Sequence, residues 1–173
     1  MIIVTGATGN IGSALITSLA ESGEDVRAVS RGARPVELPA GVDHAVADLG
    51  DLTSFASALT GGDALFLLIT GEQLMTGPDP VDVVKAAAAA GISRAVFVSS
   101  QGAVTRPGVP GYARSLAFER AFGLKPPSRG SGLGGRRRLI LLGGLTLRSE
   151  TPDEGDRQRL AQFCAPQASV AML

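Results

Sequence analysis

The segment that decides the fold is Met1-Ile-Ile-Val-Thr-Gly-Ala-Thr-Gly-Asn-Ile-Gly12, which opens the 173-residue sequence. Its short apolar run, residues 2–4, is typical of a strand buried on both faces. Three regularly spaced glycines follow, at Gly6, Gly9 and Gly12, and a helical pattern of apolar residues begins at once. The segment therefore predicts a strand, a glycine-rich turn and a helix in direct succession.

Each glycine of this turn has a separate expected role. Gly6 permits a tight turn in which φ becomes positive. The missing Cβ of Gly9 lets the backbone approach a pyrophosphate, and that of Gly12 lets the helix pack against the strand. The amides at the helix N-terminus would then face the phosphates. The turn predicts a dinucleotide site, and the alternative is a glycine-rich turn that binds no ligand.

The composition indicates one globular domain of ordinary size. Hydrophobic residues make up 45% of the chain but aromatic residues only 4%, so the core must consist mostly of Ala, Val, Leu and Ile. Cys164 is the only cysteine, which excludes an intramolecular disulfide and favours a cytoplasmic location. The sequence starts without the features of a signal peptide, and the apolar run 64–69 is too short to span a bilayer. We therefore expect no membrane partner.

Strands and helices are predicted to alternate along residues 1–122. After residues 2–4, the predicted strands are 26–30, 44–47, 64–69 and 95–99. The predicted helices follow the glycine turn, Asp51, Asp79 and residue 111, with the two aspartates as N-caps. This alternation indicates an α/β fold with a doubly wound parallel sheet, a Rossmann fold, whose ligand lies at the carboxyl ends of the strands.

Three segments carry a resemblance to a known family. Residues 5–12 read T-G-A-T-G-N-I-G, residues 99–103 read S-S-Q-G-A, and residues 118–120 read F-E-R. These motifs resemble the short-chain dehydrogenase/reductase superfamily, in particular its atypical NmrA-like branch, over residues 1–122. The resemblance implies an NAD(P)-binding domain whose glycine turn binds the cofactor through Gly6, Thr8, Gly9, Asn10, Ile11 and Gly12.

The other cofactor contacts are expected at the ends of the later strands. The acidic residue that would bind a ribose 2′-hydroxyl is replaced by Arg31, with Arg34 close behind, which favours NADP(H) over NAD(H). The alternative is that Arg31 is a solvated loop residue. Asp48 resembles the family aspartate that accepts from the adenine amino group, with Leu49 beside the ring, or else it only starts the next turn. The Thr70 hydroxyl is expected near the second ribose.

The candidate catalytic residues are Ser99, Ser100 and Tyr112. In the family that these motifs resemble, a serine at this position orients a substrate carbonyl. The resemblance therefore implies that Ser99 or Ser100 lies near the nicotinamide. A tyrosine about a dozen residues later donates a proton, aided by a lysine four residues beyond it. Tyr112 has the right spacing, but Leu116 stands where the lysine belongs. We therefore expect Tyr112 to be a poor proton donor, and its alternative role is packing against the sheet.

The resemblance implies hydride transfer from NADPH to a small electron-poor acceptor, either quinone-like or a carbonyl. The alternative is a non-catalytic NADP-binding redox sensor or a truncated, inactive relative. Three consecutive arginines at 136–138 lack interleaved aromatic residues, so no nucleic acid partner is expected. The lone His44 has no neighbouring ligands at metal-binding spacing, so no metal is expected. A missing cover over the sheet edge predicts association of the chain, for example as a homodimer.

The character of the sequence changes at residue 123. Residues 1–122 carry 8 of the 16 basic and 12 of the 16 acidic residues, so the tail 123–173 is net basic. The tail is rich in glycine, with a predicted sixth strand at 139–142 and one short helix around 156–164. An abrupt change inside a helix is what a shifted reading frame in a GC-rich gene would produce. The alternative is a short variant whose tail is a loop and one extra strand.

Overall fold

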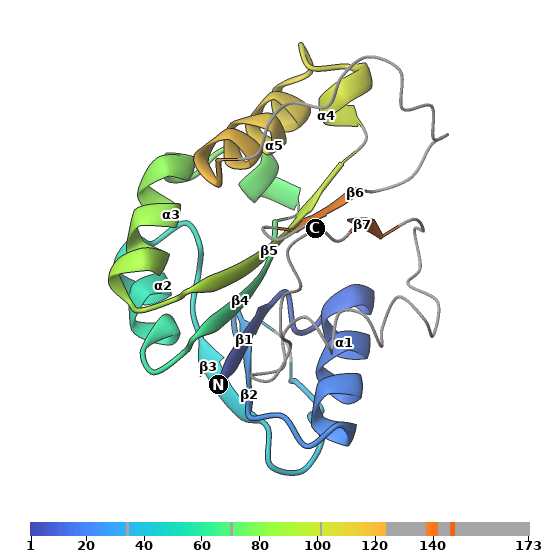
Figure 1. Ribbon diagram of the computed structural model, residues 1–173, viewed down its shortest axis with the longest axis vertical. Helices are drawn as coiled ribbons and strands as arrows, with labels where there is room; N and C mark the ends of the chain where they lie inside the picture. The colour runs from blue at the N-terminus through green and yellow to red at the C-terminus, as the bar shows by residue number, and fades with distance from the viewer. Residues whose placement is uncertain (34, 70, 101, 124–137, 142–145, 148–173) are drawn as a thin grey trace, which may run out of the picture.

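A computed structural model describes residues 1–33, 35–69, 71–100, 102–123, 138–141 and 146–147. Its strands are β1 (Ile2–Thr5), β2 (Val26–Ser30), β3 (Asp43–Val46), β4 (Ala64–Leu68), β5 (Arg94–Ser99), β6 (Arg138–Leu141) and β7 (Thr146–Leu147). Its helices are α1 (Asn10–Glu21), α2 (Leu52–Leu59), α3 (Pro80–Ala89), α4 (Gly102–Thr105) and α5 (Pro110–Ala121), with a short 3-10 helix η1 (Gly71–Leu74). The described strands form one sheet in the order β3-β2-β1-β4-β5-β6-β7 (Figure 1).

The parallel part of the sheet has β1 at its centre. Strand β1 pairs with β2 on one side and with β4 on the other. Strand β3 pairs with β2 and β5 pairs with β4, and all four pairings are parallel. The Thr5 hydroxyl ties the carboxyl ends of β1 and β4, because it donates to the Phe66 carbonyl at 3.1 Å and accepts from the Leu68 amide at 2.8 Å. The predicted Rossmann-type sheet is confirmed, and its carboxyl edge positions the site.

Two apolar clusters cover the two faces of the sheet. Helix α1 lies on one face, while α2, α3 and α5 lie on the other (Figure 1). Successive strand residues point to opposite faces, so Val4 packs in the cluster beneath α1 and Ile3 in the other. In this second cluster the Phe97 ring stacks on those of Phe118 and Phe122, with centroids 5.2 and 5.9 Å apart. These contacts hold α5 against the carboxyl end of β5.

The predicted helix caps are confirmed. The Asp51 carboxylate accepts from the Thr53 amide at 2.9 Å, and the Asp79 carboxylate accepts from the Val81 amide at 2.8 Å. Helix α5 begins at Pro110 rather than after residue 111, because proline at the first helical position has a φ suited to the helix.

Two further features depart from the predicted elements, and one prediction is not tested. The expected loops at 71–78 and 100–111 contain η1 and α4, since single helical turns are common connectors. The predicted sixth strand exists as β6, but it runs antiparallel to β5, and β7 runs antiparallel to β6. The helix expected around residues 156–164 lies outside the described residues.

Candidate cofactor and acceptor site

The glycine-rich turn joins β1 to α1 at the carboxyl edge of the sheet. Gly6 has a φ of +70°, in the left-handed region that favours glycine. A Cβ on Gly12 would overlap the Gly6 carbonyl oxygen, so helix and turn can approach this closely only with glycine at position 12. The Gly9 amide donates to the Gly6 carbonyl at 2.9 Å and closes the turn.

Helix α1 directs its N-terminus toward this turn. Its N-cap is Gly9, which makes no side-chain cap hydrogen bond, and its first turn holds no acidic residue. The first amides of a helix have no partner within the helix, and the helix dipole adds partial positive charge there. The geometry at Gly6, Gly9 and Gly12 therefore suits a pyrophosphate.

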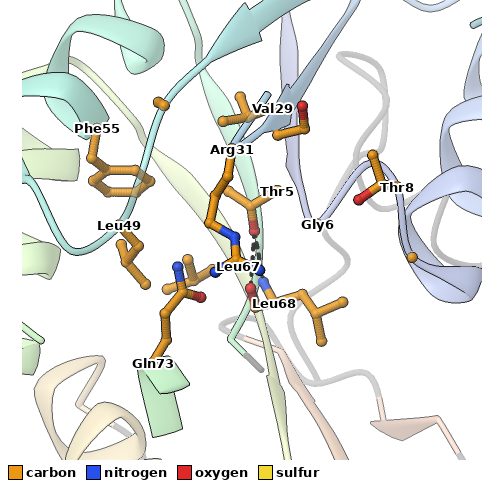
Figure 2. A pocket seen from close by; sticks show the side chains of 13 residues that line it. Thr5, Gly6, Thr8, Val29, Arg31, Leu49, Phe55, Leu67, Leu68 and Gln73 are labelled. Atoms are coloured by element: carbon orange, nitrogen blue, oxygen red, sulfur yellow. Dashed lines mark hydrogen bonds between the residues drawn. The ribbon is translucent and has the colours of Figure 1, made fainter. Parts of the chain in front are cut away.

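A cavity of about 150 Å³ opens beside the turn; we call it the cofactor cavity (Figure 2). Thr8 and Gly9 line it from the turn, and Leu49 and Phe55 supply an apolar wall. Arg31 extends into it from the end of β2 (Figure 2). None of the described residues that line this cavity is acidic. A group with several negative charges fits such a lining.

The predicted cofactor residues outside the cavity wall have different placements. Asn10 and Ile11 form the first turn of α1, where Asn10 is exposed and Ile11 half-buried. Asp48 is exposed, and its Oδ1 accepts from the Gly50 amide at 2.8 Å, so it starts the turn into α2. Oδ1 also accepts from Gln73 Nε2 at 3.3 Å. Thr70 and Arg34 lie outside the described residues.

A second cavity, of about 290 Å³, lies at the same edge of the sheet; we call it the acceptor cavity. Leu68, at the end of β4, lines both cavities, so they adjoin. Ser99 and Ser100 at the end of β5 and Tyr112 on α5 also line the acceptor cavity. The structure thus brings together the three residues that the sequence marked as candidate catalytic residues.

The Ser99 hydroxyl is engaged by a residue that sequence reasoning missed. It donates to Glu119 Oε1 at 2.5 Å, and both residues are buried, with Glu119 only 1% exposed. With its proton directed at Glu119, Ser99 can only accept a hydrogen bond from a molecule in the acceptor cavity. The signal available in the sequence was that Glu119 is the only acidic residue of α5 and directly follows the core residue Phe118.

Tyr112 also has a partner that the sequence did not predict. Arg106 Nη2 donates to the Tyr112 hydroxyl oxygen at 3.3 Å, and the Arg106 guanidinium lies 5.2 Å from the ring centroid. The Tyr112 ring also lies close to Gly102, where an added Cβ would overlap the ring. A cation therefore does lie beside Tyr112, six residues before it rather than four residues after it.

Arg114 connects α5 to the segment that carries Gln73. Its Nε donates to the Gln73 carbonyl at 2.7 Å and its Nη2 to the Pro78 carbonyl at 2.6 Å, while the guanidinium lies over the Phe118 ring. Burial lowers the pKa of Arg114 from its usual value, against the attraction of Asp79. Gln73 lines the cofactor cavity, so Arg114 couples helix α5 to the cofactor cavity.

Two absences hold for the described part of the chain. Within it, no three or more His, Cys, Asp and Glu residues gather where they could hold a metal ion. None of its helices is both long and apolar enough to cross a membrane. Cys164 lies outside the described residues.

Three features together are typical of an NAD(P)-binding Rossmann domain: a glycine-rich turn whose geometry suits a pyrophosphate, a cavity with no acidic residue among its described lining residues, and the parallel strand order β3-β2-β1-β4-β5. A family model described as NAD(P)H-binding matches residues 6–122. The chain belongs to this NAD(P)H-binding family. The match covers the part of the chain for which the motifs suggested a short-chain reductase, and it stops where the sequence changes character.

Individual relatives agree with this assignment. Quinone oxidoreductase 2 of Escherichia coli is 35% identical over 111 residues, which are 62% of this chain and 39% of that protein. A crystal structure of an NADPH-dependent quinone oxidoreductase from Escherichia coli with NADPH has a TM-score of 0.56 and 29% identity, over 71% of this chain and 44% of that one. A short-chain dehydrogenase/reductase superfamily protein from Agrobacterium tumefaciens with bound NAD has a TM-score of 0.57 and 26% identity, over 70% and 43%.

These relatives confirm the resemblance to NAD(P)-dependent short-chain reductases. The chain spans about two fifths of the length of the curated relative. One structural relative holds NADPH and the other NAD, so the family membership by itself leaves the choice of nucleotide open.

Proposed function

We propose that this chain is the NADPH-binding part of an oxidoreductase that transfers a hydride to a small electron-poor acceptor, quinone-like or a carbonyl. The observation that carries the proposal is the acceptor cavity, which adjoins the cofactor cavity at Leu68. Its volume of about 290 Å³ is at the lower limit of ordinary small-molecule sites, so it suits a small acceptor. When bound, the nicotinamide would supply the hydride.

The residues of this chain would perform the binding and orientation. The amides of the glycine turn would bind the pyrophosphate, and Leu49 with Phe55 would pack beside the adenosine. Arg31 would bind the 2′-phosphate that distinguishes NADPH from NADH, because a guanidinium forms paired hydrogen bonds with phosphate oxygens. The absence of acidic residues among the described lining residues supports this preference.

Calorimetric titration with NADPH and with NADH tests the nucleotide preference. We expect the wild-type chain to bind NADPH more tightly, and Arg31→Asp to abolish the difference by weakening NADPH binding about 100-fold. Arg120→Asp, at an exposed position on α5, makes the same change of charge and should leave both affinities unchanged. Equal weakening of NADPH and NADH by Arg31→Asp would contradict a role at the 2′-phosphate.

The Ser99–Glu119 hydrogen bond favours a second candidate, an NADP-binding sensor without turnover. It directs the Ser99 proton away from any substrate carbonyl, which leaves the acceptor cavity with less capacity to polarise one. Oxidation of NADPH in the presence of a panel of quinones separates the two candidates. Steady oxidation supports the oxidoreductase, and tight NADPH binding without oxidation of any quinone supports the sensor.

A further inference from the structure

The lone histidine of the chain is hydrogen-bonded to the edge of the cofactor cavity. His44 lies on β3, and its Nε2 is 2.9 Å from Oγ of Ser30, the last residue of β2. Ser30 lines the cofactor cavity beside Arg31, whereas His44 is not among the described lining residues. The carboxyl end of β2 is where a Rossmann domain binds the 2′-position of the ribose.

The Ser30 hydroxyl has a limited set of hydrogen bonds to offer. A hydroxyl group has one proton to donate and two lone pairs that accept. The Gly32 amide donates to Ser30 Oγ at 3.3 Å and uses one lone pair. Ser30 itself is only 6% exposed, so the bonds it makes to protein strongly restrict its orientation. Whether Ser30 presents its proton or a lone pair to the cavity therefore depends on whether His44 donates to the Ser30 hydroxyl or accepts from it.

Two arrangements are chemically distinct. If His44 Nε2 carries a proton, it donates to the second lone pair, and the Ser30 proton remains for a ligand in the cavity. If Nε2 is bare, it accepts the Ser30 proton, and only a lone pair remains. A phosphate monoester requires donors, whereas a ribose 2′-hydroxyl is satisfied by an acceptor.

We propose that His44 is a positioning residue for nucleotide selection: by donating to Ser30, it turns the Ser30 proton toward the 2′-phosphate of NADPH. This inference rests on the proposed function and deepens it, because it adds a second determinant of the preference beside Arg31. His44 reaches the phosphate only through Ser30.

A double-mutant cycle on the full chain tests this relay, with calorimetric Kd values for NADPH and NADH as the readout. We expect Ser30→Ala to lower the ratio of NADH Kd to NADPH Kd about tenfold, through loss of a hydrogen bond to a charged group. His44→Phe keeps a ring of similar size and should lower the ratio about fivefold. In the Ser30→Ala background, His44→Phe should have no further effect on the ratio.

The affinity for NADH separates the relay from a structural role. NADH lacks the 2′-phosphate, so its Kd in His44→Phe should stay within about twofold of the wild-type value. Weakening of both nucleotides by the same factor, or an equal effect of His44→Phe with and without Ser30, would overturn the relay. If wild-type protein prefers NADPH and His44→Phe leaves the ratio unchanged, this inference alone fails. If wild-type protein binds neither nucleotide, the proposed function fails as well.

Discussion

Gly12 is the residue at which a single added methyl group would disturb the site most. A Cβ there would overlap the Gly6 carbonyl and approach the Ala7 nitrogen to 3.2 Å, and both are backbone groups that cannot move independently. We expect Gly12→Ala to destabilise the fold by about 1–3 kcal/mol and to weaken NADPH binding about tenfold or more. Urea unfolding and calorimetry measure the two effects. Thr17→Ala, at an exposed position of the same helix, is the control.

Tyr112 is the residue whose substitution separates proton donation from packing. Hydride transfer to an electron-poor quinone needs little acid assistance, so we expect Tyr112→Phe to keep kcat within about threefold. Gly102→Ala, which would displace the ring, should raise KM for the quinone more than Tyr112→Phe does. A loss of about 100-fold in kcat for Tyr112→Phe would instead assign the proton to the phenol.

The residues of the site were predictable where their roles are local in sequence. The positive φ of Gly6 and the close approach at Gly12 follow from a strand, a turn and a helix that are adjacent in the chain. The partners of Ser99 and Tyr112 were not predictable, because Glu119 and Arg106 reach them only after α5 docks on the sheet and α4 forms. Spacing rules describe contacts along one element and not contacts between elements.

At the scale of elements, helix α2 is the clearest case of a local signal with a measurable effect. Its cap, Asp51, is exposed and accepts from the Thr53 amide. We expect Asp51→Ala to lower the free energy of unfolding by about 1 kcal/mol, since an amide at the helix N-terminus loses its partner. Asp51→Asn retains an acceptor and should change stability much less. Chemical denaturation measures the difference, and equal loss in both variants would contradict capping.

The strands and long helices were predictable because their hydrophobic patterns repeat over several residues. Strands 26–30 and 64–69 and the helix after Asp79 agree with the structure to within one or two residues. The single-turn helices η1 and α4 are too short to show a period. The antiparallel direction of β6 was not predictable either, because a short apolar run does not indicate whether the strand will run parallel or antiparallel to its neighbour.

On the scale of the whole molecule, Asp63 links the start of β4 to the start of β5 and to the N-terminus. This cluster lies at the edge of the sheet opposite the site. Its carboxylate binds Arg94 Nη2 at 2.9 Å and the Met1 amino group at 3.1 Å. Partial burial raises the pKa of Asp63, but the hydrogen bonds from the Met1 amino group and Arg94 outweigh it, so the pKa lies below its usual value.

A lowered pKa in the folded state makes this contribution dependent on pH. The stabilisation is complete above the pKa of Asp63 in the unfolded chain, about 4, and is lost as the pH falls through the lower folded-state value. We expect Asp63→Asn to reduce the free energy of unfolding by about 0.5–1 kcal/mol at pH 7, because the pair is partly exposed. The difference from wild type should shrink toward pH 3. Urea unfolding at both pH values measures it, and a difference that grows in acid would contradict the assignment.

The central position of β1 also has a consequence for how the protein is made. Ile2 pairs with Ala64, sixty-two residues further along the chain. At ordinary rates of translation the ribosome needs roughly 3 to 12 seconds to add that length. During this interval the nascent β1 has no β4 to pair with, so one side of this apolar central strand stays unpaired while synthesis continues. Chaperone capture of short nascent chains is therefore expected to cease once residues 64–68 have left the exit tunnel.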